Sequence, residues 1–344
     1  MIYLEAGLFA ILAVLFLHTS TSDLKSGRIR NKSILIALGV GLACAVCYYV
    51  FFATDCLLAY FVNSGISIVI SLILYATGIW GAGDSKLLVT TIVLFPARIY
   101  CMNNRSMASC FILIAVIFIV SFFYVVIDTV VWGIRKKDLF EIPKQKVDWK
   151  SYVKGFLFFF LMISLANAII YVILPTGILL DSVLLTAIHF VLILIGMHLA
   201  EKINWYIILI MGFMWILSLI FGISHITLSG INWVSYLVVI VLMLFRLVAD
   251  KYNYKTILAT DLKPGMILSV GSVLAFTGSR VSGLPRHTSE DLKSRLSSEE
   301  VDSILRWSKS KNGQETITIV RKIPFALFIA IGTVLFTLLE VFGA

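Results

Sequence analysis

Charged residues are scarce in this chain. Asp, Glu, Lys and Arg make up 14% of its 344 residues, whereas 60% of the residues are apolar. A soluble domain carries about 25% charged residues. A soluble globular fold and a disordered chain are therefore excluded, and the composition predicts an all-α polytopic membrane protein. The formal net charge of +9 then reports mainly on membrane topology and is no evidence of nucleic-acid binding.

Cysteine is also scarce, with five residues scattered along the chain. This number excludes a small disulfide scaffold. The Cys-x-x-Cys pair of Cys44 and Cys47 lies within an apolar run, where thiols mostly act as small apolar side chains. A zinc site needs roughly four ligands. We therefore expect no metal and no other cofactor.

Long apolar runs, by contrast, recur throughout the sequence. A membrane-spanning helix needs about 20 apolar residues, and helices are expected because backbone groups in lipid must be paired internally. The first run has no Lys or Arg before Lys25, so it reads as a retained helix and not as a signal peptide. We expect ten spans, the fourth of them short, at approximately 2–22, 33–53, 56–80, 85–100, 108–132, 152–174, 182–200, 203–222, 231–249 and 323–341.

The basic residues predict the orientation of these helices. With the N-terminus outside, all Lys and Arg residues except Arg98 and Arg105 fall in cytoplasmic segments. Cytoplasmic loops are enriched in Lys and Arg, so both termini are expected on the outer side of the cell membrane. Tryptophans near the span ends, Trp80 among them, are expected at the membrane interface.

Two polar stretches interrupt the apolar runs. Residues 133–151 form a basic cytoplasmic loop, and residues 250–322 are long enough for a small mixed α/β cytoplasmic subdomain. In the subdomain, Lys263-Pro264-Gly265 predicts a turn, and the segments MILSV and SVLAF around Gly271 predict short strands. Ser297 and Glu300 form a capping box at the start of a helix that is expected to end near Asn312-Gly313. A strand of sequence TITIV follows.

Two aspartates lie where the sequence predicts helix ends at the cytoplasmic face. Asp23 ends the first helix, and Asp84 follows Gly81 and Gly83 at the start of the fourth. The glycines permit a chain break and close backbone approach. Short loops link the first four helices, so the two carboxylates can be neighbours. Taken singly, each aspartate has a plainer interpretation, Asp23 as a helix terminator and Asp84 as an N-cap.

Together with their flanks, these residues resemble the type IV prepilin peptidases, aspartyl proteases of the intramembrane type with a Gly-x-Gly-Asp motif. The resemblance rests on Asp23 followed by Arg28 and Asn31, on Gly81, Gly83, Asp84 and Lys86, and on Pro324 in the Ile-Pro-Phe segment that opens the last helix. It covers residues 1–110 well and 255–341 loosely. We therefore expect a catalytic membrane core at 1–110, additional helices at 111–249, the subdomain at 250–322 and a final helix at 323–344.

The resemblance implies an endopeptidase that removes the leader from type IV pilin-like precursors at the cytoplasmic face. Two carboxyl groups that share a site cannot both ionise cheaply, so one acts as acid and the other as base toward water. Asp23 and Asp84 are the expected dyad. The expected partners are a precursor with a basic leader and a hydrophobic helix, and the lipid bilayer. The Cys-x-x-Cys insert of the methylating family members is missing, so methyl transfer is not expected.

A different class of protein stays open, a transporter or an assembly subunit of a pilus or secretion system. Helices broken by glycine next to an aspartate also occur at transport sites, but those sites lie near the membrane midplane. A presenilin-like protease fits less well, because Ser22 precedes Asp23 and Phe325 interrupts the last motif. Lys25, Arg28, Arg30 and Lys86 are expected mainly as membrane anchors. Asp128 is expected to be a contact between helices, and a metal site shared by His189 and His198 is not expected.

Overall fold

The chain is mostly helical. The computed structural model describes residues 1–77, 80–101, 109–136, 149–173, 182–200, 203–222, 235–240, 254–279, 281–288, 294–310, 313–320 and 324–342. Within them, six helices are long and apolar enough to cross a membrane. They are α1 (Ile2–Ser26), α2 (Asn31–Phe51), α3 (Leu57–Ala76), α6 (Cys110–Lys136), α7 (Trp149–Ile173) and α13 (Phe325–Phe342).

Two further apolar helices, α8 (Ser182–Ala200) and α9 (Trp205–Ile220), contain shorter apolar stretches. Ten spans were expected, and six are found in the part of the chain that the structure describes. Of the run expected at 231–249, residues 235–240 are helical and most of the rest lies outside the described residues. The basic loop expected at 133–151 also falls largely outside them, since residues 137–148 are not described.

The fourth expected span, 85–100, is divided into two helices. Helix α4 (Ala82–Leu94) ends before Phe95, and α5 (Ala97–Cys101) follows Pro96. Phe95 has an extended backbone, φ −75° and ψ 132°, which is the conformation that a following proline favours. The 13 residues of α4 measure about 20 Å along the helix axis. This helix is thus shorter than a hydrocarbon core of roughly 30 Å.

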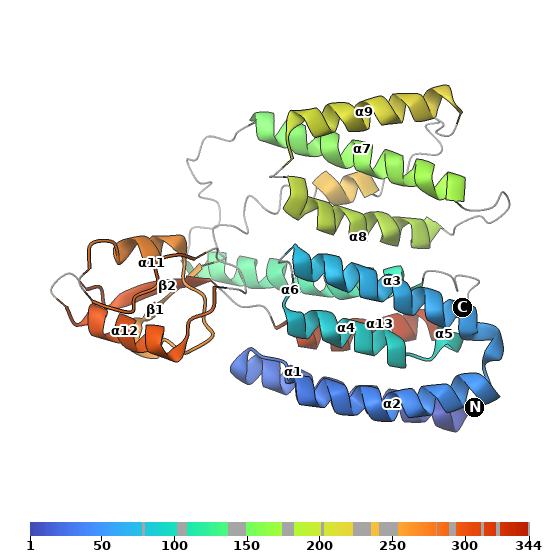
Figure 1. Cartoon of the computed structure of the whole chain (residues 1–344), viewed down its shortest axis with the longest axis horizontal. Helices are drawn as coiled ribbons and strands as arrows, with labels where there is room; N and C mark the ends of the chain where they lie inside the picture. The colour runs from blue at the N-terminus through green and yellow to red at the C-terminus, as the bar shows by residue number, and fades with distance from the viewer. Residues whose placement is uncertain are drawn as a thin grey trace.

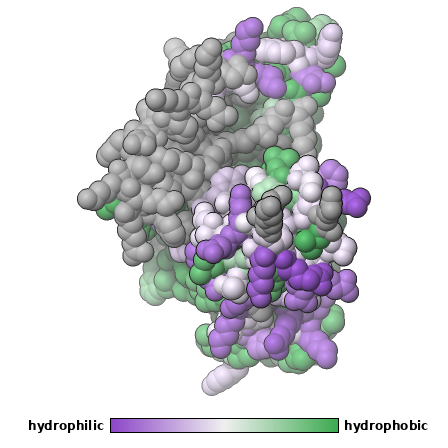
Figure 2. Space-filling model, turned by 90° about the vertical axis from the view of Figure 1, so that its left-hand side faces the viewer, coloured by the Kyte–Doolittle hydropathy of each residue, from purple (hydrophilic) through white to green (hydrophobic). Residues whose placement is uncertain are grey.

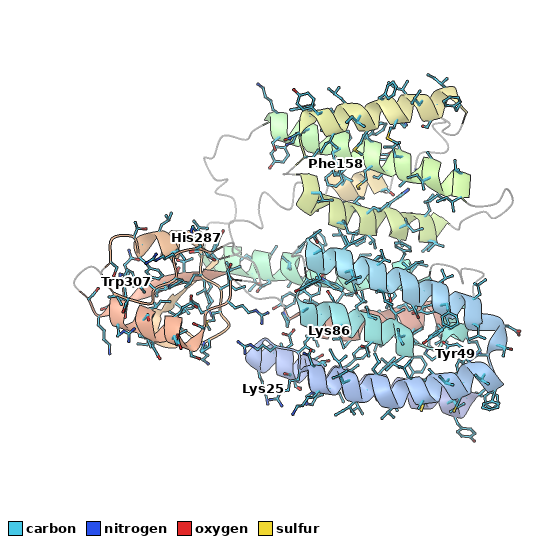
Figure 3. The ribbon with its side chains drawn as sticks, in the orientation of Figure 1. Lys25, Tyr49, Lys86, Phe158, His287 and Trp307 are labelled. Carbon is cyan, nitrogen blue, oxygen red and sulfur yellow. The ribbon has the colours of Figure 1, made fainter. Side chains whose placement is uncertain are left out.

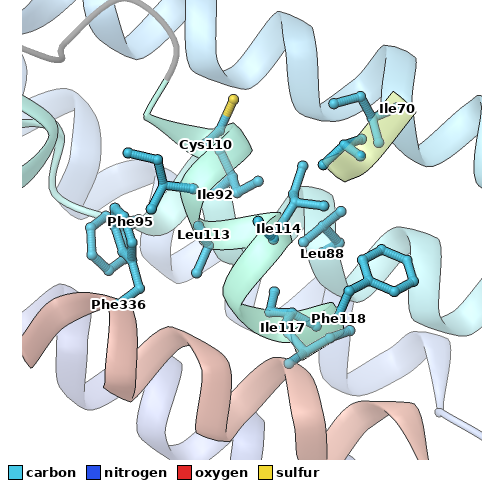
Figure 4. Packing of buried hydrophobic residues seen from close by; sticks show 14 of the residues in the cluster. Ile70, Leu88, Ile92, Phe95, Cys110, Leu113, Ile114, Ile117, Phe118 and Phe336 are labelled. Atoms are coloured by element: carbon cyan, nitrogen blue, oxygen red, sulfur yellow. The ribbon is translucent and has the colours of Figure 1, made fainter. Parts of the chain in front are cut away.

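The helices form two bundles (Figure 1). In the first bundle, α1 packs on α2 and α13, α3 packs on α4, and α6 packs on α13. In the second bundle, α7 packs on α8 and α9. Contact between α6 and α8 joins the two. Figure 4 shows part of the core of the first bundle, to which α4, α6 and α13 contribute Leu88, Ile117 and Phe336.

Helix α13 packs closely against α6 although more than 180 residues separate them in the sequence. A methyl group built on Gly332 of α13 would lie 2.6 Å from Cγ1 and 2.8 Å from Cα of Ile117 on α6. Real Cβ atoms do not approach others so closely. The two helix backbones can therefore touch here because residue 332 is a glycine, as in other packed membrane helices.

The polar subdomain, residues 254–320, is a small mixed α/β unit. Strands β1 (Tyr254–Leu258) and β2 (Thr316–Val320) pair antiparallel, with Ile257 opposite Ile317. Helices α11 (Val270–Ala275) and α12 (Ser298–Ser308) complete it, with Phe276 and Trp307 in edge-to-face contact at 4.6 Å in the core. Figure 2 faces this end of the molecule and shows hydrophilic side chains gathered on it.

The structure of the subdomain confirms some of the elements predicted from the sequence and corrects others. The turn at Pro264-Gly265, the capping box of Ser297 and Glu300 and the strand TITIV are present. The prediction that SVLAF forms a strand is wrong, because this segment lies in α11 and the turn that follows it. The Ser269 side chain accepts a hydrogen bond from the Ser272 amide and so caps a helix at this point. Helix α12 ends at Ser308, earlier than expected.

The two ends of the first bundle differ in character. The start of α1 and the end of α13 lie at one end, and the polar subdomain lies beyond the other (Figure 1). This arrangement agrees with a topology in which both termini are on one side of the membrane and the subdomain is on the opposite side. We call the end next to the subdomain the polar end of the bundle.

Candidate active site at the polar end of the bundle

Asp23 lies in the last turns of α1 and is buried, with 6% of its surface exposed. Gly27 terminates the helix in the left-handed conformation, φ 65°, and donates its backbone N–H to the Asp23 carbonyl at 2.8 Å. The Asp23 carboxylate accepts the N–H of Ala326 at 3.3 Å. Ala326 is in the first turn of α13, where free N–H groups and the helix dipole favour a negative charge. The side chain of Asp23 thus joins α1 to α13.

Asp84 lies in the first turn of α4 and is partly exposed. Its carboxylate accepts the Gly81 N–H at 3.2 Å, which is the carboxylate half of a capping box. Gly81 has an extended backbone and begins the helix. The capping role expected for Asp84 is therefore present, although the residue is the third of the helix and not the N-cap.

The segment of residues 27–31, which we call loop 27–31, runs between the two aspartates. A methyl group built on Gly83 would lie 3.0 Å from Cβ of Ile29, so this loop packs closely against the residue before Asp84. Lys86 donates from Nζ to Oδ1 of Asn31 at 3.3 Å. The Ser22 hydroxyl donates to the Arg28 carbonyl at 2.7 Å. The loop is thus bonded to both α1 and α4.

The structure accordingly brings most of the expected site residues to the polar end. Helices α1, α4 and α13 contact one another pairwise. Figure 3 shows Lys25 at the end of α1 that faces the subdomain, and Tyr49 at the opposite end of the bundle. Pro324 directly precedes α13, and its carbonyl accepts the Leu327 N–H at 3.3 Å. Proline is favourable at such a helix start because it lacks the N–H that would be unpaired there.

A shallow pocket of about 190 Å³ lies near the end of α1, next to loop 27–31. It is lined by polar side chains of α1 and of loop 27–31: His18, Thr21, Ser22, Lys25 and Arg30. His18 is hydrogen-bonded through Nδ1 to the Ser33 hydroxyl at 2.9 Å. Just below the pocket, Leu17 exposes 70% of its surface. The pocket therefore lies where the apolar face of α1 gives way to polar groups, as expected at a membrane surface.

Trp80 is a residue of this end that the sequence interpretation misplaced. It was expected at the membrane interface, but it is 1% exposed. Its ring stacks on Phe118 of α6 at 5.2 Å and lies 5.3 Å from the ring of Phe325 at the start of α13. Trp80 thus connects the segment before Gly81 to α6 and α13. Trp80 directly precedes the Gly-x-Gly-Asp motif, and this position was the sequence signal for a place in the packing around the site. The expected end of a membrane span explained the same position equally well.

The described residues contain no group of three or more His, Cys, Asp or Glu side chains that could hold a metal ion. His189 lies in the second bundle and is fully buried. Its ring nitrogens are hydrogen-bonded to Ser235 and Asn167, at 2.9 and 2.8 Å. These contacts fit a structural histidine that links neighbouring helices.

Residues 10–132 match the family model of the type IV leader peptidase family. The match covers about a third of the chain, and this part of it is similar to that family. The family is one of peptidases, which are hydrolases, and the matched residues hold both Asp23 and Asp84. Searches of curated proteins and of solved structures found no match. We call the matched residues 10–132 the leader peptidase segment. It begins within α1 and ends within α6, so α7 to α9, the polar subdomain and α13 lie beyond it.

Proposed function

We propose that the chain is an aspartyl endopeptidase that removes the leader peptide from type IV pilin-like precursors, with Asp23 and Asp84 as its catalytic dyad. The observation that carries this proposal is the position of the two carboxylates. Both lie within the leader peptidase segment, at the same end of one bundle, on helices that contact each other. Loop 27–31 contacts the helix ends that carry them.

The proposed mechanism needs only these two side chains and water. One carboxylate takes a proton from the attacking water, and the other carboxyl group donates its proton to the carbonyl oxygen of the scissile peptide, which gives a tetrahedral diol. The first carboxyl group then gives its proton to the amide nitrogen as the C–N bond breaks, and the second takes a proton back from the diol. Like-charge repulsion between two close carboxyls favours the state with a single shared proton, which supplies one base and one acid. The proton belongs to the pair, so neither aspartate is assigned a fixed role.

The location suits a substrate with a polar leader and a following apolar helix. Apolar side chains such as Leu17 are exposed on the bundle surface, while hydrophilic residues gather at the polar end. A precursor whose helix lies in the membrane would present its leader junction at this depth. We propose that this end faces the cytoplasm of a prokaryotic cell, as the distribution of Lys and Arg predicts.

A transporter remains the second class of function, and the geometry favours it less. Transport sites with broken helices lie near the membrane midplane. Asp23 and Asp84 lie instead in a last and a first helical turn at the polar end. A peptidase that acts at the membrane surface needs its acids at this position.

Replacement of each aspartate by asparagine tests the dyad. The probe is a co-expressed precursor with a short basic leader, an apolar helix and a soluble reporter domain, and cleavage is followed by the size of the reporter. Asn keeps the shape of the side chain but cannot hold or release the proton. We expect Asp23→Asn and Asp84→Asn each to lower the cleavage rate at least about 100-fold, the scale of acid–base catalysis.

Asp55→Asn is the matched control for this experiment. Asp55 is an exposed carboxylate of the short helix η1 (Thr54–Cys56), which connects the far ends of α2 and α3. Its replacement removes the same charge away from the proposed dyad, so the cleavage rate should stay at the wild-type value. Wild-type rates in either the Asp23 or the Asp84 variant would refute the dyad.

A further inference from the structure

Loop 27–31 is held from two sides. On its membrane side it contacts the ends of α1 and α4, as described above. On its other side lies the polar subdomain, which is far away in the sequence. Arg295 donates from Nη1 to the Gly27 carbonyl at 3.4 Å. The Arg28 guanidinium lies against Gly265, where a methyl group built on that glycine would be 3.5 Å from Nη2 and 3.7 Å from Nε.

The two contact points belong to a rigid part of the subdomain. Gly265 donates its N–H to the Leu296 carbonyl at 2.8 Å, and Leu296 returns a bond to Met266 at 2.9 Å. Leu268 next to this pair forms a bridge with Ile319 of β2. Leu296 and Leu268 are 3% and 2% exposed. Gly265 and Arg295 are therefore presented by a paired, packed backbone and not by a free loop end.

Gly265 also has a backbone conformation that favours glycine. Its φ is +91°, a region that residues with a side chain rarely adopt. The missing Cβ leaves the space over which the Arg28 guanidinium lies. A single glycine thus supplies both the turn after Pro264 and a flat surface for Arg28.

The held loop is bonded directly to Asp23 and contacts the residue before Asp84. The Gly27 amide donates to the Asp23 carbonyl at 2.8 Å, and the carbonyl of the same residue accepts from Arg295. Ile29 contacts Gly83, the residue before Asp84. A displacement of the loop would therefore move the last turn of α1 and the first turn of α4 relative to each other.

We propose that the polar subdomain positions the catalytic aspartates by clamping loop 27–31 through Arg295 and Gly265. Arg295 is then a positioning residue, since it acts on Asp23 through Gly27. The subdomain lies outside the residues that match the leader peptidase family, so the clamp adds a function to a part of the chain that the match leaves unassigned. The proposal rests on the proposed peptidase function for its effect on catalysis, but the clamp itself can be measured separately.

The first test compares Arg295→Gln with Arg306→Gln in the full chain. Arg306 donates to Ser303 within the subdomain at 2.8 Å, and its replacement removes the same charge without a contact to the loop. Hydrogen exchange of the amides of residues 27–31 is the first readout. We expect exchange to become at least threefold faster in Arg295→Gln and to stay unchanged in Arg306→Gln. Unchanged exchange in Arg295→Gln would overturn the clamp.

Cleavage of the reporter precursor is the second readout. Small misplacements of catalytic groups cost roughly 10- to 100-fold in rate, so kcat should fall at least about tenfold in Arg295→Gln with KM nearly constant. Arg295→Lys should recover part of the rate, because its ammonium can donate one hydrogen bond to Gly27. A normal kcat in Arg295→Gln, or a change in KM alone, would overturn the positioning role. If the wild-type chain cleaves no precursor, the peptidase proposal fails and the exchange rates alone decide on the clamp.

A pair of glycine variants tests the second contact point. Gly265 and Gly278 both have positive φ, +91° and +84°, but no atom lies within 4 Å of a methyl group built on Gly278. Gly265→Ala and Gly278→Ala thus bring similar backbone strain, and only the first disturbs Arg28. We expect faster exchange in residues 27–31 and a lower kcat for Gly265→Ala alone. Equal effects of the two variants would mean that strain in the subdomain, and not the clamp, is responsible.

Discussion

The side chain of Glu5 links several helices at the end of the first bundle that is opposite the proposed site. Its carboxylate accepts two hydrogen bonds from Arg98, at 2.7 and 2.9 Å, and a third from the Tyr48 hydroxyl at 2.8 Å. Glu5 is 7% exposed, so its charge needs these partners. The three residues come from α1, α5 and α2, and together they hold the far ends of these segments in place.

Glu5→Gln should therefore destabilise the protein while leaving catalysis intact. The variant keeps the shape of the side chain but loses the charge that pairs with Arg98. Hydrogen bonds to charged groups contribute about 1.5–3 kcal/mol each, and the partial exposure of Arg98 reduces this value, so we expect a loss of about 2 kcal/mol. Thermal unfolding in detergent measures it. Asp55→Asn should leave the unfolding midpoint unchanged, and an equal shift in both variants would contradict the structural role of the pair.

At the scale of residues, sequence reasoning succeeded where the partners are local. The capping box of Ser297 and Glu300 spans three positions, and both of its hydrogen bonds are present. Arg98, which forms the ion pair with Glu5, is 93 positions away, and no local pattern points to it. Asp23 and Asp84 were selected from the sequence by their flanks, and their catalytic role stays a prediction.

At the scale of helices and strands, the contact between α6 and α13 depends on one glycine. Gly332→Leu would place a branched side chain where even a methyl group meets the backbone of Ile117. The helices must then separate, at a cost of about 1–3 kcal/mol for overpacking. We expect a lower unfolding midpoint and a lower cleavage rate, because α13 also carries the Ala326 amide that is bonded to Asp23.

Gly39→Leu is the control for that variant. Gly39 lies in α2, and a methyl group built on it meets no atom within 4 Å. The leucine would extend into open space, and leucine is a better helix former than glycine. The unfolding midpoint should stay equal or rise slightly. A fall as large as that of Gly332→Leu would show that leucine is harmful at any glycine of these helices.

The elements that the sequence misplaced have identifiable causes. Proline at position 96 separates α4 from α5, although the apolar run continues across it. The segment SVLAF was expected to form a strand because of its apolar residues, but the Ser269 cap makes it helical. Strand β1 was missed because its partner β2 lies about sixty residues later in the chain. Periodicity and composition reach their limit where a cap or a distant strand decides the conformation.

At the scale of the whole molecule, the two termini and the subdomain lie at opposite ends of the first bundle (Figure 1). Epitope tags before α1 and after α13 should therefore respond alike to protease, and a tag inserted at Gly278 should respond in the opposite way. We expect the terminal tags to be digested in intact spheroplasts and the Gly278 tag only in inverted vesicles. Different responses of the two terminal tags would contradict the arrangement, and a reversed pattern would contradict the orientation.

Hydropathy predicted a helical membrane protein correctly, since lipid leaves the backbone few alternatives. It could not predict the grouping of the helices into two bundles. Apolar surfaces that face lipid and apolar surfaces that face another helix have the same composition, as Leu17 at 70% and Leu12 at 1% exposure show on α1. The packing of α6 on α8 is a matter of shape, which a hydropathy pattern does not encode.

The position of α13 has a consequence for how the protein matures. The helix is translated long after α1, α4 and α6, yet it packs on all three and supplies the amide that is bonded to Asp23. During synthesis, both aspartates enter the membrane before this partner exists. The nascent chain therefore lacks the hydrogen bond between Asp23 and Ala326 until its final helix is inserted.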